Sequence, residues 1–116
     1  DIGSVDIKPE GAELRFHSAF QPRGANANFV QVDNDRVLVR TYERGVEDET
    51  LACGTGVTAA AILSHLVHKV EKPVRLKVSG GDMLEVDFRV DGNTIDKVTL
   101  TGPAKAVYSG TIEIEV

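Results

Sequence analysis

The sequence contains little cysteine and no cluster of basic residues, and each shortage excludes a class of protein. Its 116 residues include one cysteine, Cys53, so no internal disulfide can form, and we expect a reducing, cytoplasmic compartment. Lys and Arg together number 13 against 18 Asp and Glu, which gives a formal net charge of -5. Because the basic residues are dispersed, nucleic acid is not expected as a partner.

Long apolar runs are absent as well. The longest, Val57–Val67, is too short to span a bilayer, and Ser64 and His65 interrupt it. No basic and apolar segment of the signal type opens the sequence, so no membrane association is expected. The length suits a single domain, residues 1–116, which can bury a core without disulfides or metal.

The three histidines give no metal-binding pattern. His17, His65 and His68 are not spaced for ligation together with Cys53 or with a group of carboxylates. His65 and His68 fall near the end of a predicted helix, where they favour its C-terminal dipole. Gly80-Gly81-Asp82 is a turn and not a phosphate loop, because no helix pattern follows it. These residues therefore predict neither a metal site nor a phosphate-binding loop.

The patterns that are present predict an α+β domain with short strands curled around one central apolar helix. The helix is predicted at Gly54–His68, and because its apolar residues occur nearly all round, we expect it to be buried on most sides. Residues 3–9 are interpreted as irregular, and Asp33-Asn34-Asp35 as a hairpin turn. The predicted strands are Glu13–Phe16, Asn28–Val32, Arg36–Thr41, Val74–Val78, Leu84–Val90, Thr94–Thr101, Ala104–Tyr108 and Thr111–Val116.

Cys53 is the main candidate for chemistry, because it directly precedes the predicted helix. Helix N-termini carry partial positive charge and unpaired N–H groups, which stabilise a thiolate. The same N–H groups, from Gly54 and Thr55, can bind an anion, and the side-chain-free Gly54 and Gly56 would let a ligand approach the backbone. A base could thus lie beside a bound carboxylate. The alternative is a buried structural cysteine at a tight turn, which is the commoner role of a lone cysteine.

Glu43-Arg44-Gly45 is a second candidate site, upstream of the cysteine. A carboxylate and a guanidinium could bind the ammonium and carboxylate of one amino-acid substrate. Strand neighbours face opposite sides, so both reach one ligand only if the chain bends, which Gly45 permits. A surface ion pair is the alternative. Asn26 and Asn28 are loop or strand-end asparagines, which more often satisfy backbone groups than bind ligands.

These segments resemble the diaminopimelate epimerase family. Glu43-Arg44-Gly45-Val46 followed by Glu49–Gly56 is similar to its signature, and Asn26–Val32 resembles its asparagine-containing strand. The resemblance extends from about residue 17 to the end of the chain. One departure is local: the family usually has Gly-Glu-Thr after the Val, and Glu47-Asp48-Glu49-Thr50 is one residue longer.

The resemblance implies an isomerase of lysine and peptidoglycan precursor biosynthesis, with two similar domains of strands around a central helix. The family interconverts L,L- and meso-diaminopimelate without pyridoxal phosphate or metal, using one cysteine from each domain on opposite faces of the α-carbon. It implies that Cys53 is the second of these cysteines and that Glu43 assists proton transfer and contacts substrate. It also implies that Arg44 and Asn26 bind the distal end of the substrate, and that the N–H groups of Gly54 and Thr55 bind the α-carboxylate.

The family's first cysteine and its Gly-Asn-Pro-His-like segment are not found in this sequence. The chain therefore resembles the C-terminal half of a two-domain enzyme, and we expect it to be inactive without the N-terminal domain, its predicted partner. The predicted strand Thr111–Val116 would lack its neighbours, so self-association, for example as a homodimer, is expected. Alternatives are a proline-racemase-like or other cofactor-independent epimerase, and a non-catalytic amino-acid-binding or assembly module.

Overall fold

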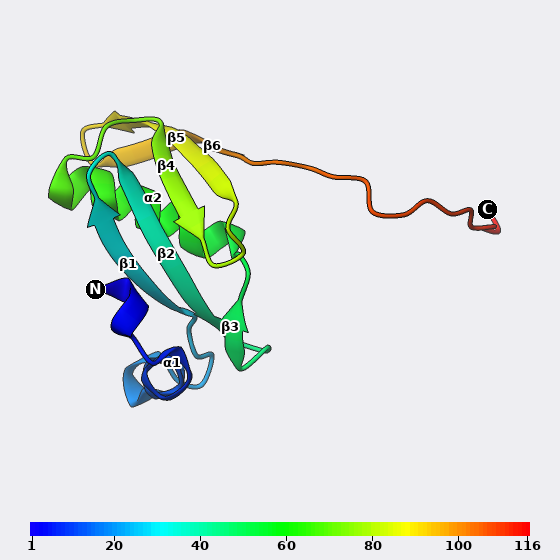
Figure 1. The fold of residues 1–116 in the computed structure, drawn as a ribbon, viewed down its shortest axis with the longest axis horizontal. Coiled ribbons are helices and arrows are strands. Elements are labelled where there is room, and N and C mark those ends of the chain that lie inside the picture. The colour runs from blue at the N-terminus through cyan, green and yellow to red at the C-terminus, as the bar shows by residue number, and fades with distance from the viewer.

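The computed structural model describes residues 1–116 and has one mixed sheet of six strands with two α-helices against it (Figure 1). This confirms the predicted α+β class. The elements in chain order are η1 (Ile2–Ser4), α1 (Ile7–Arg15), η2 (Ser18–Phe20), β1 (Ala27–Asp33), β2 (Arg36–Glu43), β3 (Asp48–Thr50), α2 (Gly54–His68), β4 (Val74–Val78), β5 (Met83–Asp91) and β6 (Thr94–Thr101).

The sheet has the strand order β1-β2-β4-β5-β6, with β3 paired to the end of β2. β1 and β2 form the predicted hairpin, which turns at Asn34 in the left-handed region (φ 56°). β2 and β4 are parallel, so the chain crosses between them through β3 and α2. β4, β5 and β6 then continue as antiparallel neighbours, with a register irregularity between Asp87 and Arg89.

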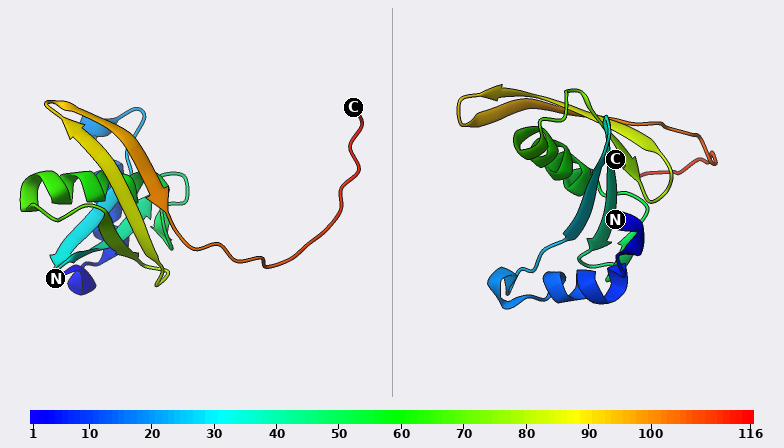
Figure 2. Two further views of the ribbon diagram at one scale, coloured as in Figure 1. Left: turned by 90° about the horizontal axis from the view of Figure 1, so that it is seen from above. Right: turned by 60° about the vertical axis from the view of Figure 1, so that its left-hand side comes forward.

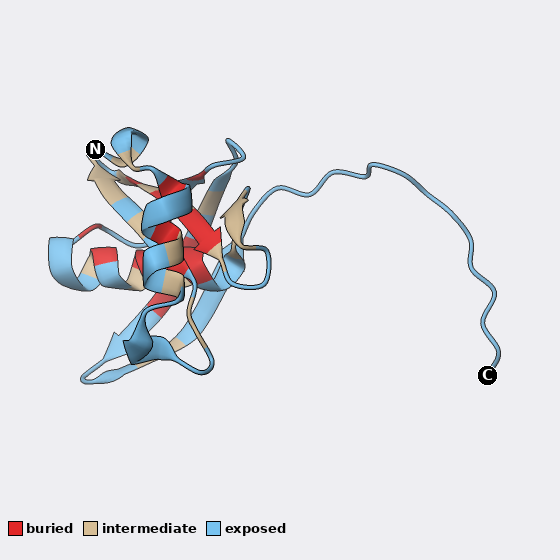
Figure 3. Cartoon of the chain, turned by 90° about the horizontal axis from the view of Figure 1, so that it is seen from below, coloured by how far each residue is buried: buried red, intermediate tan, exposed pale blue.

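α2 lies across one face of the sheet, and the main core forms between the two (Figure 2). Val37 and Val39 of β2 belong to this core, whereas Tyr42 belongs to a second, smaller cluster with Ile7 of α1. The buried residues therefore concentrate where the helix meets the strands (Figure 3). The largest fully buried side chains are Leu76, Val37, Val57, Val74 and Val86.

The bounds of α2 agree with the prediction, but the expectation that it is buried on most sides is wrong. Leu63 and Val67 on its outer side are 60% and 64% exposed. The reason is that the sheet covers one side of the helix, and no other segment covers the opposite side (Figure 2). The strands lie against the helix without surrounding it. No helix of the structure combines the length and apolarity needed to cross a bilayer.

α1 corrects two predictions, since residues 3–9 are not irregular and Glu13–Phe16 is not a strand. The helix starts at Ile7, so Pro9 falls in its first turn, where the missing N–H has no helical partner to lose. The Glu10 carboxylate accepts the Asp6 N–H at 3.1 Å, which supports the helix start. Only two residues of the helix are buried, so its sequence shows a weak apolar pattern.

The C-terminal segment, residues 102–116, corrects two more predictions. It contains no strand, every residue in it is exposed, and it extends away from the sheet (Figure 1). The alternation of Ile112, Ile114 and Val116 with polar residues led to the strand prediction. A strand also needs a neighbour for its backbone hydrogen bonds, and this segment has none.

Arg40 joins the N-terminal segment to the sheet through an ion pair and further hydrogen bonds. Arg40 of β2 donates from Nε and Nη2 to the two carboxylate oxygens of Glu49 in β3, both at 2.8 Å. Its Nη1 donates to the carbonyls of Ile2 and Val5 at 2.9 and 3.0 Å. Ser79 Oγ donates to Glu49 Oε1 at 2.7 Å. One guanidinium thus connects three segments, and its hydrogen bonds to Glu49 lower the pKa of that carboxyl.

We predict that Gly11→Ala destabilises the chain, because the added Cβ would meet Tyr42 Cγ and Cδ2 at 2.6 and 2.7 Å. Separating α1 from β2 should cost about 1–3 kcal/mol, as overpacking generally does. Denaturant unfolding followed by circular dichroism measures the free energy. Gly110→Ala is the matched control, because nothing lies within 4 Å of the added Cβ. Equal stability of the two variants would contradict the prediction.

We predict that Glu49→Gln lowers the free energy of unfolding by about 1–3 kcal/mol near pH 7. The folded-state pKa of Glu49 is lowered, so its contribution is present above the unfolded pKa of about 4.3 and is lost as the pH falls through the folded value. The difference between wild type and variant should therefore vanish in acid. Glu85→Gln, at an exposed carboxylate without an ion pair, serves as control. A difference that is independent of pH would refute the argument.

Candidate active site at the start of α2

Cys53 lies in the short connection between β3 and α2, as the residue that precedes the first turn of the helix. Its backbone is extended (φ -134°, ψ 113°), and its carbonyl accepts the Val57 N–H at 2.8 Å. The side chain makes no capping hydrogen bond, and the thiol is free and half-buried. The sulfur therefore lies at the positive end of the helix without being used by the helix.

Two polar side chains lie next to the sulfur. The Asn26 amide nitrogen donates to Cys53 Sγ over 3.8 Å, and Thr55 Oγ1 lies 3.4 Å from it. Both contacts are long, as hydrogen bonds to sulfur are. They give the thiol polar neighbours, in contrast to the apolar surroundings of a buried structural cysteine.

Asn26 joins the cysteine to the second predicted site. While its Nδ2 faces the sulfur, its Oδ1 accepts the Arg44 N–H at 2.7 Å. One side chain thus connects the segment before β1, the turn after β2 and the start of α2. Local patterns in the sequence do not predict a contact between Asn26 and Cys53, which are 27 residues apart.

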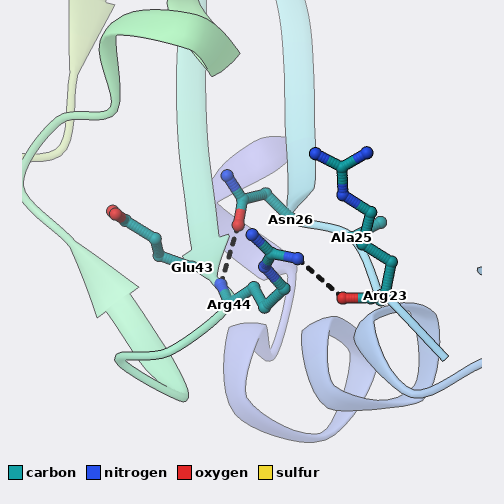
Figure 4. A pocket seen from close by; sticks show the side chains of 6 residues that line it. Arg23, Ala25, Asn26, Glu43 and Arg44 are labelled. Carbon is teal, nitrogen blue, oxygen red and sulfur yellow. Dashed lines mark hydrogen bonds between the residues drawn. The ribbon is translucent and has the colours of Figure 1, made fainter. Parts of the chain in front are cut away.

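The second site is an open hollow of about 340 Å³ on the surface, which we call the polar hollow (Figure 4). One wall consists of residues 23–26 and the other of Glu43 and Arg44. The Arg44 guanidinium donates from Nη1 to the Arg23 carbonyl at 2.7 Å, across the hollow. The lining therefore offers cationic and anionic groups together, which suits a small ligand that carries both charges.

Glu43 and Arg44 are both among the residues that line the polar hollow. The bend occurs at Gly45, whose φ of 92° is favourable only for glycine. The two side chains leave the turn in different directions, and they form no ion pair with each other (Figure 4). The structure therefore does not support the alternative that they are a surface ion pair.

The glycines after Cys53 serve different purposes. Gly56 is buried, and a Cβ there would meet Asn28, whose Cγ would be 2.9 Å away. Asn28 Oδ1 also accepts the Thr41 hydroxyl at 2.7 Å. Gly56 is therefore needed for close packing of α2 on β1, and it is unavailable for ligand approach, contrary to the prediction. Gly54, the first residue of α2, is exposed.

Glu47 has a role that the sequence did not predict, although its segment is one residue longer than is usual in the family. Its Oε1 accepts the Gly45 N–H at 2.8 Å and Arg15 Nε at 2.9 Å, and its Oε2 accepts the Tyr42 hydroxyl at 3.3 Å. The Gly45 hydrogen bond, and after it Arg15, lower the Glu47 pKa. Burial raises the pKa of Tyr42. The feature that distinguishes Glu47 is a left-handed backbone at a charged residue (φ 61°). This feature is visible only in the structure, so no signal in the sequence could have indicated the role of Glu47.

The histidines lie apart from Cys53. His65 Nδ1 lies 2.7 Å from the Val70 carbonyl at the end of α2, which agrees with its predicted place there. His17 Nδ1 accepts the Ala19 N–H at 3.1 Å. No three His, Cys, Asp or Glu side chains come together as metal ligands would.

Comparison with known proteins gives the family. The family described as "Diaminopimelate epimerase" matches residues 1–107. The chain belongs to this family. It is 48% identical over 118 residues to a diaminopimelate epimerase of Aquifex aeolicus (strain VF5), covering 100% of the chain and 41% of the relative. Identity is 44% over 116 residues to the Chlorobaculum tepidum enzyme of the same name, covering 98% of the chain and 44% of that protein.

A third diaminopimelate epimerase, from Flavobacterium psychrophilum, is 41% identical over 114 residues. The match covers 97% of the chain and 44% of that protein. The chain thus spans about two fifths of the curated relatives it matches. It is a domain-sized portion of a diaminopimelate epimerase family protein, and the resemblance found in the sequence is confirmed at the level of the family.

Proposed function

We propose that this chain supplies one half of the active site of an epimerase that interconverts L,L- and meso-diaminopimelate without a cofactor. The observation that carries the proposal is the free Cys53 thiol at the start of α2, linked through Asn26 to the Arg44 turn of the polar hollow. Family membership favours this chemistry over the other reactions of cysteine. The reaction belongs to lysine and peptidoglycan precursor biosynthesis.

In the proposed mechanism, Cys53 is one of two proton-transferring groups. As a thiolate it takes the α-proton, so that the C–H bond breaks and its electron pair stays on the substrate. A second thiol on the opposite face then gives a proton to the α-carbon. Two groups are needed because a single base that returned its own proton would tend to restore the starting configuration. The N–H groups of Gly54 and Thr55, at the open start of α2, bind the α-carboxylate.

The polar hollow would bind the distal end of the substrate, which carries an ammonium and a carboxylate. Arg44 is the proposed partner of the carboxylate and Asn26 an additional hydrogen-bonding group. Glu43 contacts the substrate and assists proton transfer. Support comes from the position of Asn26 between the sulfur and the Arg44 N–H, because one substrate could then extend from the thiol to the hollow.

The chain contains only one cysteine, so the second thiol of the proposed mechanism comes from outside this chain. We propose that the chain is the C-terminal half and that a separate N-terminal domain carries the other cysteine. Its length, about two fifths of the relatives, is in keeping with this. The 116-residue chain alone is then expected to be inactive.

The exposed C-terminal segment fits the same proposal. Its side chains Val107, Tyr108, Ile112 and Ile114 are 75–88% exposed, which is unfavourable for apolar groups in water. We propose that residues 102–116 pack against the absent domain, and that without it the chain self-associates, for example as a homodimer. Sedimentation of the chain with and without residues 102–116 tests whether this segment causes the self-association.

We predict that Cys53→Ser in a complete enzyme lowers epimerisation by at least about a thousandfold, because a hydroxyl is far less acidic than a thiol. Interconversion of the two diaminopimelate isomers is followed by chiral chromatography. Ala59→Ser, at an exposed position of the same helix, is the control and should keep full activity. Epimerisation retained by Cys53→Ser would remove Cys53 from the mechanism.

A substrate panel separates the proposal from its alternatives. Turnover of proline without turnover of diaminopimelate would indicate a proline-racemase-like enzyme. Binding of an amino acid without α-proton exchange, together with labelling of Cys53 at an ordinary thiol rate, would indicate a binding module. The polar hollow, with Glu43 and Arg44 in its lining, favours a substrate whose distal end is charged.

A further inference from the structure

The polar hollow is built from two loops that flank the paired strands β1 and β2, at the end where Ala27 lies opposite Tyr42. Residues 23–26 precede β1, and Glu43 and Arg44 end β2 and begin the turn to β3. Each loop has a glycine in the left-handed region, Gly24 with φ 74° and Gly45 with φ 92°. Two hydrogen bonds join the walls directly, from the Arg44 N–H to Asn26 Oδ1 and from Arg44 Nη1 to the Arg23 carbonyl. Because loops of this kind move readily, contacts from outside the hollow also affect the spacing of the walls.

Arg15, the last residue of α1, contacts both loops. Its Nε donates to Glu47 Oε1 at 2.9 Å. Its guanidinium also lies against Gly24, because a Cβ on that glycine would meet Arg15 Nη1 and, at 3.1 Å, Cζ. The Arg15 carbonyl also accepts the side-chain amide of Gln21, which shortly precedes the same loop, at 3.3 Å. At 15% exposed, the Arg15 side chain is the least exposed member of the six ion pairs.

Glu47 connects Arg15 to the second loop. Its Oε1 accepts the Gly45 N–H at 2.8 Å, directly after the two residues that line the hollow. Its own N–H donates to the Glu43 carbonyl at 2.8 Å, which closes the turn. Its Oε2 accepts the hydroxyl of the buried Tyr42 at 3.3 Å, which anchors the carboxylate to β2. Neither Arg15 nor Glu47 lines the hollow.

We propose that Arg15 and Glu47 are positioning residues that fix the distance between the two walls of the polar hollow, and thereby the binding of the distal end of the substrate. The role of these two residues in substrate binding rests on the function proposed above. The inference gives a role to the longer segment Glu47-Asp48, which the sequence shows but does not explain. It also gives α1 a role in the site, although no residue of α1 reaches the hollow.

A merely structural ion pair is the competing explanation, and the chain contains a matched control for it. Lys8 of α1 pairs with Asp48 of β3 at 3.2 Å, between the same helix and the residue after Glu47. Both side chains are largely exposed, at 69% and 49%, and neither contacts the hollow. Lys8→Gln therefore removes a link between α1 and the β3 segment without touching the connection from Arg15 to the walls.

The first test measures amide hydrogen exchange in the complete enzyme without substrate. In Arg15→Gln, exchange in residues 23–26 and 43–47 should become about threefold faster or more, because both loops lose their common contact. In Lys8→Gln, exchange in these residues should stay at the wild-type rate. Equal exchange in wild type and Arg15→Gln would overturn the proposal.

The second test measures steady-state kinetics with meso-diaminopimelate. Arg15→Gln should raise KM by about five- to tenfold and leave kcat within about twofold, because the distal end is held equally in ground and transition states. Glu47→Gln keeps an oxygen for the Gly45 N–H and should raise KM less than Glu47→Leu. Lys8→Gln should leave both constants unchanged.

The two tests separate the inference from the proposed function. Faster exchange with an unchanged KM would mean that the contact fixes the loops without affecting substrate, which overturns the proposal. An equal rise of KM in Arg15→Gln and Lys8→Gln would mean that the Arg15–Glu47 pair acts only through the general stability of the fold. That result would also overturn the proposal. If the wild-type enzyme does not act on diaminopimelate, the proposed function fails, while exchange still decides whether Arg15 fixes the walls.

Discussion

The candidate site depends on the side-chain amide of Asn26. It accepts the Arg44 N–H at 2.7 Å and faces Cys53 Sγ at 3.8 Å, and no other side chain contacts both segments. A single hydrogen bond of this kind contributes only about 0.5–1.5 kcal/mol to stability. Its importance is geometric, because it fixes the thiol and the polar hollow relative to each other. An amide has both a donor and an acceptor, whereas a carboxylate at this position would have acceptors only and could not donate to the sulfur.

The two faces of the sheet carry different contacts, and together these contacts position the thiol and the polar hollow. On the α2 face, Thr41, Asn28 and Gly56 pack closely and fix the first turn of the helix on β1. On the α1 face, Tyr42 contacts Ile7 and the Glu47 carboxylate. β2 therefore carries one set of contacts to each helix. The site lies at the end of β2, where its last residue and the turn beyond it meet the start of α2.

Much of this could be predicted from the sequence. The bounds of α2, the hairpin at Asn34, and the strands from Val74 to Thr101 follow from local patterns, which operate over a few residues. Cys53 at a helix start and the bend after Arg44 follow from the same local signals. These predictions succeeded because neighbouring residues suffice to determine them.

The failures concern contacts between distant parts of the chain. α1 was missed because its burial depends on Tyr42, and Gly56 was misinterpreted because Asn28 fills the space beside it. Residues 102–116 have a strand-like pattern but no neighbour to pair with. The contact of Asn26 with Cys53, and that of Arg15 with Glu47, join residues 27 and 32 positions apart. Composition and periodicity carry no information on such pairs.

The central claim is that Cys53 acts on a substrate together with a second thiol from outside this chain. The most direct measurement is incorporation of deuterium from heavy water at the α-carbon of diaminopimelate, when the chain is mixed with the complementary domain. The account predicts incorporation with the mixture, none with either part alone, and none when Cys53→Ala replaces the wild-type chain. Incorporation by the complementary domain alone, or undiminished incorporation with Cys53→Ala, would contradict it.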